Sequence, residues 1–371
     1  MAEQITPRKV YAIATDITST MGSGTAAHWD AIISGHTGIA QHTDENGMAY
    51  YASKLNEIPA VKDGENYTSF ERLCIYSAGK ALETQSIDPD KTVLVLSTTK
   101  GNIEQLNQLP DNTTLLSSSA KVIAKALGIT AKPLVVSHAC ISGSVALLYA
   151  QRLLSSGRYE HAIVLGCDSF TPFVLKGFQS FQAIADGPCR PFDADRTGIN
   201  LGEAAATVIL SVDDDNAIAE LPGGATSNDA NHISGPSRTG EELSDAINRA
   251  MQDADVQAAD IDMISAHGTA TAYNDEMEAK AINLSGLSEV PLHSMKSYTG
   301  HTLGAAGVLE SAMVLEAIKR QALIPSAGYE KHGVSVPVNV TTETAPAEIR
   351  CVLKTASGFG GSNAAIIWRK V

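Results

Sequence analysis

The sequence is poor in cysteine, in aromatic residues and in long apolar runs. Its 371 residues include five cysteines, an odd number, and no two of them have CxxC spacing. This pattern does not favour a disulfide framework or a structural zinc site. No stretch approaches the roughly 18 apolar residues that a membrane-spanning helix needs. The N-terminal residues also lack the apolar segment of a signal peptide, so we expect a cytosolic protein.

Positive charge is also in short supply. The formal net charge is -14, from 27 basic and 41 acidic residues. An acidic surface does not favour non-specific binding of nucleic acid. The composition is otherwise that of a globular protein, with 44% hydrophobic residues and 30 glycines.

Short apolar runs alternate with helical segments along the chain, which favours an α/β fold. The length suits two packed halves, and we place their boundary after the acidic turn at 213–215, giving residues 1–216 and 217–371. The predicted strands are Val10–Ala14, Thr92–Ser97, Leu134–Ser137, His161–Gly166, Ala205–Ser211, Met263–Ala266 and Ala364–Trp368. The predicted helices are Gly24–Ser34, Ser118–Leu127, Ser142–Ser155, Glu241–Ala254, Asp275–Asn283 and Leu303–Ile318.

Cys140 follows a predicted strand and directly precedes a helix. The unpaired N–H groups at a helix start stabilise a thiolate, so we expect this thiol to have a lowered pKa. His267 and His301 also lie at a strand end or a helix start. Taken singly, Cys140 fits a structural or a functional role about equally well, whereas each histidine is more readily explained as a structural residue. Taken together, they suggest an acyl-transfer site. A zinc site would need a fourth ligand and closer spacing.

The segments around Cys140 and His301 follow a similar pattern. ACISGSVALLYAQ and YTGHTLGAAGVLESAMVLEA each place a reactive side chain where a turn meets a helix rich in small residues. The pattern is compatible with two related α/β halves that face each other.

Five blocks of the sequence, in order, jointly resemble the β-ketoacyl synthase family of the thiolase superfamily. They are HACISGS, RPFDADRTGINLGEAAA, SAHGTATAYNDEMEA, KSYTGHTLGAAG and SGFGGSN. The resemblance implies a thiolase-like fold in which two α/β halves pack as a five-layer αβαβα sandwich. It implies an elongation-type β-ketoacyl–acyl carrier protein synthase, which extends an acyl chain by decarboxylative condensation with malonyl thioester in fatty-acid, polyketide or polyene biosynthesis.

The resemblance also implies a role for each site residue. Cys140 would carry the acyl group, and His267 and His301 would stabilise the enolate formed as carbon dioxide leaves. Lys296 would support this set, together with Glu278. The N–H groups of Cys140 and Phe359 would form an oxyanion hole, with Phe359 also acting as a gate. Further implied contacts are Thr269 and Thr271 with the phosphopantetheine arm, and Glu310 and Asn363 with a structural cation.

The expected partners are an acyl carrier protein, which brings the phosphopantetheine, and a second subunit in a homodimer or a heterodimer. No other cofactor is expected. Lys121, Lys125 and Arg196 are candidates for contact with an acidic carrier. The chain departs from the family pattern at several positions, which suggests a specialised synthase. They are Lys100 in place of Gly, His138 in place of Thr, Ala204 in place of Gly and Ser357 in place of Phe.

Four alternatives differ from this assignment in the residues that they would need. A degradative thiolase would need a second cysteine near the C-terminal glycine-rich loop, and Cys351 lies several residues too early. A starter-type synthase would have asparagine where this chain has His301. A catalytically inactive chain-length-factor-like subunit would lack Cys140. A small-molecule binding protein with the same fold would not need Cys140, His267 and His301 together.

Overall fold

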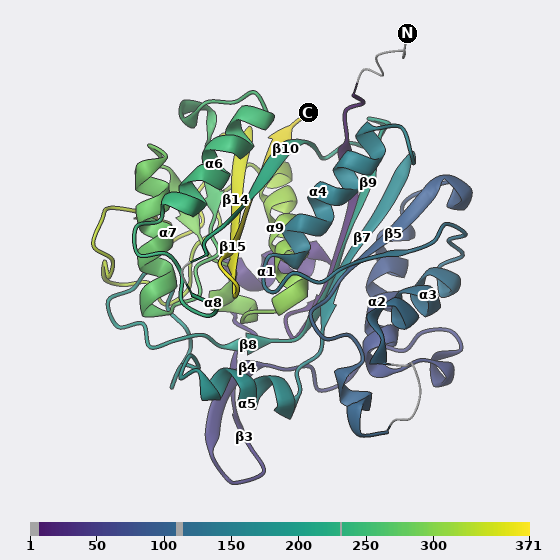
Figure 1. The fold of residues 1–371 in the computed structure, drawn as a ribbon, viewed down its shortest axis with the longest axis horizontal. Coiled ribbons are helices and arrows are strands. Elements are labelled where there is room, and N and C mark those ends of the chain that lie inside the picture. Colours follow the sequence, from purple (N-terminus) through teal and green to yellow (C-terminus); the bar gives the residue numbers. More distant parts are fainter. Residues whose placement is uncertain (1–6, 109–113, 231) are drawn as a thin grey trace.

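Two groups of strands with the same internal order run through the molecule (Figure 1). The computed structural model describes residues 7–108, 114–230 and 232–371. The main strands are β1 (Tyr11–Ser19), β5 (Thr92–Ser97), β6 (Leu134–Val136), β7 (His161–Asp168), β9 (Ala204–Ser211), β10 (Ala219–Asn228), β11 (Met263–Ser265), β12 (Pro291–His293), β13 (Asn339–Val340), β14 (Cys351–Gly358) and β15 (Ser362–Lys370). The N-terminal order is β6-β5-β7-β9-β1, and the C-terminal order is β12-β11-β14-β15-β10 with β13 beyond β12.

The strand directions repeat along with the order. In the N-terminal group, β6, β5 and β7 are parallel, and β9 and β1 each pair antiparallel to their neighbour. In the C-terminal group, β12, β11 and β14 are parallel, and β15 and β10 pair antiparallel in the same way. A short ladder between β1 and β10 joins the groups. The two halves therefore share one topology, and β6 with its following helix corresponds to β12 with its own.

The helices form three layers around the strands (Figure 1). Helices α4 (Ser142–Ser155) and α9 (Ala306–Arg320) contact strands of both groups and each other, so they lie in the centre. Helices α2 (Ser69–Leu82) and α3 (Leu116–Ala126) cover the outer face of the N-terminal group. Helices α6 (Glu241–Asp253) and α7 (Ala272–Leu284) cover that of the C-terminal group. This confirms the expected αβαβα arrangement.

Shorter elements complete the fold. Helix α1 (Thr25–Ile33) packs on α9, and α8 (Lys296–Thr299) precedes His301. Helix α5 (Pro172–Ser180) lies below the strands in Figure 1, near the small sheet of β3 (Ala40–Thr43), β4 (Ala49–Ser53) and β8 (Leu201–Gly202). The two-residue β2 (Gly22–Ser23) pairs with β1. The boundary that we placed at 216/217 falls in the connection between β9 and β10.

The central helices approach closely because glycines face each other. A Cβ atom added to Gly307 would lie 2.4 Å from the backbone nitrogen of Ser144, and one added to Gly143 would lie 2.7 Å from that of Val308. Contacts below 3 Å between a Cβ and backbone nitrogen are not tolerated without a shift of the backbone. The pair Gly143 and Gly307 therefore lets the first turns of α4 and α9 touch.

Most predicted elements are confirmed, and a few were missed. The bounds of β5 and α4 match the prediction residue for residue, because an apolar run such as TVLVLS and a long helix rich in apolar and small residues carry strong local signals. Strand β14 was missed because Lys354 and Thr355 interrupt its apolar pattern, although both are buried. Helix α2 was missed despite a capping box formed by Thr68 and Glu71.

Across the described ranges 7–108, 114–230 and 232–371, no helix is long and apolar enough to cross a membrane. The cytosolic location stays a prediction. So does the absence of a signal peptide, because residues 1–6 lie outside the described part of the chain.

We expect Gly307→Ala to lower the free energy of unfolding, because the new methyl group meets the backbone of α4. Overpacking of this kind costs about 1–3 kcal/mol. Chemical denaturation followed by circular dichroism measures the change. Gly79→Ala in α2 is the matched control, because a Cβ at Gly79 meets no atom within 4 Å. An equal effect of the two substitutions would contradict the close crossing.

Candidate active site

Cys140 sits on a tight turn between β6 and α4. Ala139, just before it, has a φ of 45°, a left-handed conformation that is uncommon for a residue other than glycine. The Ser142 hydroxyl fixes this turn: it accepts the His138 N–H at 2.7 Å and donates to the Ala139 carbonyl at 2.6 Å. Strained turns of this kind expose nucleophiles at the junction of a strand and a helix.

The Cys140 thiol is protonated in the resting protein. Burial raises the pKa of Cys140 to about 11, and this outweighs the lowering by the Lys296 and Lys100 charges and by the Phe359 N–H. The expectation of a lowered pKa is therefore wrong, because the thiol is only 8% exposed and the helix begins two residues later. A thiolate has to form during the reaction.

His301 is held by the segment that contains the RTGINLGE motif. Its N–H donates to the Asn200 carbonyl at 2.7 Å, and its own carbonyl accepts the Gly202 N–H at 2.9 Å. A Cβ at Gly202 would lie 2.1 Å from the Thr299 carbonyl oxygen, so only glycine permits this approach. The backbone of this motif thus positions His301.

The tautomer of His301 follows from its contacts. Its Nδ1 accepts the Leu303 N–H at 3.3 Å, so the neutral ring carries its proton on Nε2. Within the described part of the chain, Nε2 has no hydrogen-bond partner. An N–H donor is therefore free to bind an oxygen atom of a ligand.

His267 is positioned through its backbone by Glu278. The carboxylate of Glu278 accepts the N–H groups of His267 at 2.8 Å and Gly268 at 2.7 Å. It also accepts the Thr355 hydroxyl at 2.6 Å. The rings of His267 and His301 meet edge to face, with centroids 5.3 Å apart. Glu278 thus sets the turn that brings the two imidazoles together.

Both imidazoles are neutral at physiological pH. Burial lowers the pKa of His267 and of His301 well below the usual value, and the nearby Lys296 charge lowers each further. Neutral imidazole can donate one hydrogen bond and accept another. The pair is thus suited to stabilising an oxyanion without a metal.

The predicted pair of Lys296 and Glu278 is not formed. Lys296 Nζ instead lies 2.6 Å from Glu310 Oε1, and both side chains are buried. The other oxygen of Glu310 lies 2.8 Å from Lys354 Nζ, a residue that the sequence analysis missed. The position of Lys354 within an otherwise apolar strand could have indicated that this lysine is buried. Two ammonium groups thus share one carboxylate behind the histidines.

The predicted cation site at Glu310 and Asn363 is also not formed. Glu310 is taken up by the two lysines, and Asn363 Oδ1 accepts the Ser357 hydroxyl at 2.8 Å. No cluster of three or more histidine, cysteine, aspartate or glutamate residues that could hold a metal ion occurs among the described residues.

Thr269 and Thr271 lie on a turn held by Asp275, which was not predicted. Asp275 Oδ1 accepts the N–H groups of Thr269 at 2.9 Å and Ala270 at 3.1 Å. Its Oδ2 accepts the Phe192 N–H at 2.7 Å, which ties the RPFD motif to the same turn. Burial raises the pKa of Asp275 to about 7. The two threonine hydroxyls lie 2.9 Å apart.

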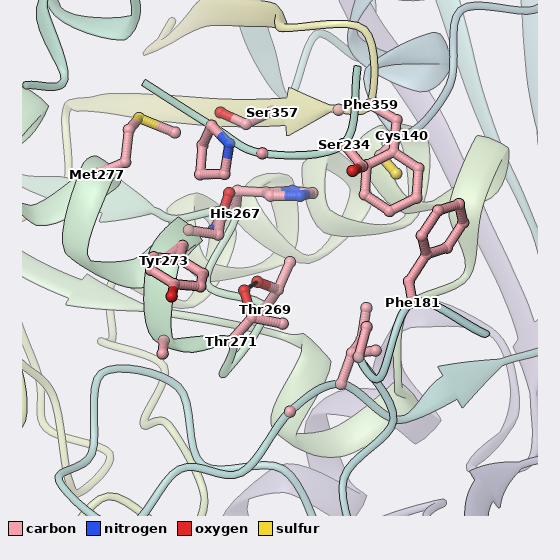
Figure 2. A pocket seen from close by; sticks show the side chains of 18 of the residues that line it. Cys140, Phe181, Ser234, His267, Thr269, Thr271, Tyr273, Met277, Ser357 and Phe359 are labelled. Carbon is pink, nitrogen blue, oxygen red and sulfur yellow. Dashed lines mark hydrogen bonds between the residues drawn. The ribbon is translucent and has the colours of Figure 1, made fainter. Parts of the chain in front are cut away.

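A pocket of about 480 Å³ joins these parts (Figure 2). In Figure 2, Thr269, Thr271 and His267 line one part of the pocket, and Phe359 lies beside Cys140. The predicted residues that line it are Cys140, His267, Thr269, Thr271, His301, Phe359 and Asn363. Lys296, Glu278 and Glu310 do not line it and lie buried behind it.

A second cavity of about 410 Å³ also reaches Cys140. Three aromatic rings border both cavities: Phe359 stacks on Phe178 at 5.8 Å and meets Phe181 edge to face at 5.3 Å. Gly358 permits this arrangement, since a Cβ there would lie 3.0 Å from the Cys140 nitrogen. Phe359 thus borders both cavities beside the thiol, and its role as a gate stays a prediction.

The three predicted carrier contacts divide into two groups. Lys121 and Lys125 line one shallow hollow together with Lys132. Arg196 is engaged within the fold: its guanidinium donates to the carbonyls of Asp193 and Gly333, and its side chain is 9% exposed. These contacts leave little of Arg196 accessible to a carrier, and its contact with a carrier stays a prediction.

The sequence matches two models of one protein family, which together cover most of the chain. Residues 8–216 match the family model of the β-ketoacyl synthase N-terminal domain, and residues 218–330 match that of the C-terminal domain. The chain belongs to the β-ketoacyl synthase family.

Relatives within the family are found by sequence and by structure. The ketoacyl synthase alpha subunit of the tetracenomycin polyketide synthase from Streptomyces glaucescens is 28% identical over 93% of both chains. A putative polyketide β-ketoacyl synthase from Streptomyces halstedii is 34% identical over 68% of this chain, and the matched segment covers 64% of that relative's length. A ketosynthase from Xenorhabdus doucetiae, solved in complex with its chain length factor, superimposes with a TM-score of 0.86 at 25% identity, over 98% of both chains.

The raised pKa of Cys140 predicts how its alkylation depends on pH. With a pKa of about 11, the reactive thiolate fraction rises about tenfold per pH unit from pH 7 to pH 10. The rate of modification by iodoacetamide, measured by peptide mass spectrometry, should follow this slope. The variant Cys140→Ala is the control, because the modified peptide that arises from Cys140 should be absent from it. A plateau below about pH 9 would show that the thiol is more acidic than its burial implies.

Glu278→Gln should destabilise the turn at His267. Glutamine offers one acceptor oxygen where the carboxylate offers two, so a buried N–H loses its partner at a cost of about 1–3 kcal/mol. Thermal and urea unfolding measure the loss. Glu276→Gln, two residues earlier in α7 on a more exposed side chain, is the control. Equal stability of the two variants would argue against the clamp.

Proposed function

We propose that this chain condenses a thioester-bound acyl group with a malonyl thioester, with loss of carbon dioxide, to form a β-ketoacyl thioester. One observation carries the proposal. A single thiol lies where two cavities meet, and two neutral imidazoles lie beside it. Such a site can hold an acyl chain on one side and an extender unit on the other.

In the first half-reaction, Cys140 accepts the acyl group. The sulfur attacks the thioester carbonyl, the bond to the carrier sulfur breaks, and the carrier thiol leaves with the proton given up by Cys140. We assign the N–H groups of Cys140 and Phe359 to bind the oxyanion of the tetrahedral intermediate, and the close approach of Gly358 to the Cys140 nitrogen supports this role. The acyl chain then occupies the second cavity, whose wall includes Phe173, Val174 and Leu303.

In the second half-reaction, the malonyl thioester enters the first pocket past Thr269 and Thr271. Its carbon–carbon bond to the carboxylate breaks, carbon dioxide leaves, and the electron pair forms an enolate. The thioester oxygen is bound by His301 Nε2–H and by His267, which disperse the charge without becoming cations. The enolate carbon attacks the acyl-Cys140 carbonyl, and the Cys140 thiolate leaves.

The malonyl and acyl groups arrive on the phosphopantetheine arm of an acyl carrier protein, and no other cofactor takes part. We propose a dimer, either with a second copy or with a related subunit. Support for the related subunit comes from a structural neighbour that was solved with its chain length factor. Polyketide synthases among the relatives favour a polyketide-type pathway over housekeeping fatty-acid synthesis.

Two alternatives fit the residues less well. A thiolase needs a second cysteine at the site, and of the five cysteines, all described and all free, only Cys140 lines the pocket. A catalytically inactive chain-length-factor-like subunit has no use for the thiol and the two imidazoles that line this pocket, or for the lysine buried behind them.

The test is intact-mass spectrometry after incubation with a panel of acyl carrier proteins loaded with different acyl groups. We expect a mass gain of one acyl group that is absent in Cys140→Ala. Addition of malonyl carrier protein should then discharge the adduct and give a β-ketoacyl product. A folded protein that accepts no acyl group, alone or with a related subunit, would overturn the proposal.

A further inference from the structure

Lys354 is a second lysine that the fold buries completely, and the reaction described above does not use it. It lies on β14, is 0% exposed, and its Nζ is 2.8 Å from Glu310 Oε2. It also donates to the carbonyl of Thr355. Burying an ammonium group costs several kcal/mol even after relaxation, so a buried lysine needs compensating charge.

The compensation extends over four side chains. Lys296 and Lys354 contribute two positive charges, and Glu310 and Glu278 contribute two negative ones, all of them buried. Glu310 contacts both lysines. Burial lowers the pKa of Lys354, and the negative charges of Glu310 and Glu278 oppose this lowering. Removing Lys354 would leave this buried cluster with one negative charge in excess.

The same lysine is connected to both histidines. In the parallel pairing of β11 with β14, Ser265 lies opposite Lys354, and His267 follows two residues later. Thr355, the next residue after Lys354, donates to the Glu278 carboxylate that holds the His267 N–H. Through Glu310, Lys354 also fixes Lys296, which is close enough to act on His301.

We propose that Lys354 is a positioning residue for decarboxylation: a built-in cation that pairs with Glu310 and so fixes Lys296 and the two imidazoles. The inference rests on the proposed function. It assigns Lys354 to the second half-reaction, because the acylation of Cys140 needs the thiol and the backbone N–H groups rather than the histidine pair.

Its charge also bears on pH dependence. The groups that face Lys354 are Glu310 from α9, Lys296 from α8, Glu278 from α7, His293 from β12, and the two site histidines. The positive charge of Lys354 lowers the pKa of His267 and of His301. Without it, both rings would take up a proton at a higher pH, and activity would begin to fall at a higher pH as the solution is acidified.

The experiment compares Lys354→Met, which keeps length and loses charge, with Lys370→Met, which changes an exposed lysine on the adjacent strand β15. We expect Lys354→Met to slow malonyl decarboxylation by about tenfold or more, as for residues that support a directly acting group. Acylation of Cys140 should stay within about threefold of the wild type, and the acid limb of the rate profile should move to higher pH. Lys370→Met should change none of these. An equal slowing of both half-reactions, or no change, would overturn the proposal.

A second variant covers the case in which Lys354→Met does not fold. Lys354→Ala leaves a space bordered by the Glu310 carboxylate and the Thr355 carbonyl, which are oxygen ligands suited to a small cation. Added potassium or methylammonium ions should then restore folding and decarboxylation. Failure of both ions to restore either property would overturn the role of Lys354 as a cation.

Nuclear magnetic resonance separates this inference from the proposed function. In protein labelled at histidine, the imidazole signals of His267 and His301 can be assigned with His267→Asn and His301→Asn. If the wild type condenses no substrate, the proposed function fails. The imidazole titrations still test the role of Lys354. A pKa of His267 that is higher in Lys354→Met than in the wild type supports this role, and an unchanged pKa overturns it.

Discussion

The close crossing of α4 and α9 is the constraint on which the site depends. Cys140 precedes α4 and His301 precedes α9, at equivalent places in the two halves. These two side chains can share a pocket only if the first turns of the two helices touch. Gly143 and Gly307 permit this contact, since a side chain on either would overlap the backbone of the opposite helix. The duplicated topology thus brings together two different reactive groups, one from each half.

Burial sets the chemical state of the site. The thiol has a raised pKa and both imidazoles have lowered ones, so all three groups at the pocket are neutral before substrate binds. The charged groups lie one layer behind, where the two lysines meet Glu310 and where Glu278 holds the backbone at His267. A neutral pocket backed by fixed charges suits a reaction in which negative charge develops and then disappears.

Two buried carboxylates near the site, Asp168 and Asp275, hold loops together through backbone N–H groups. Asp168, at the end of β7, accepts N–H bonds from Thr99, Lys100 and Gly304 and so joins the turn after β5 to the one after His301. Asp275 does the same for the turns at Thr269 and Phe192. Each carboxylate links two segments that are far apart in the sequence. Acidic residues of this kind therefore position the loops of the pocket and do not take part in the reaction.

By itself, the sequence determined the α/β class, the repeated strand–turn–helix pattern and the three side chains at the pocket. These depend on local features: buried apolar runs, helix starts and glycine-containing turns. The partners of the buried charges were decided only by the tertiary structure. Glu278 and Glu310 lie on either side of Lys296 in the sequence, and nothing in the sequence says which of them pairs with it. The choice of Glu310 depends on how α7, α8 and α9 pack. Lys354 and Arg196 make the same point, because burial and long-range contacts, rather than residue type, decide whether a basic side chain faces a carboxylate, a backbone carbonyl or water.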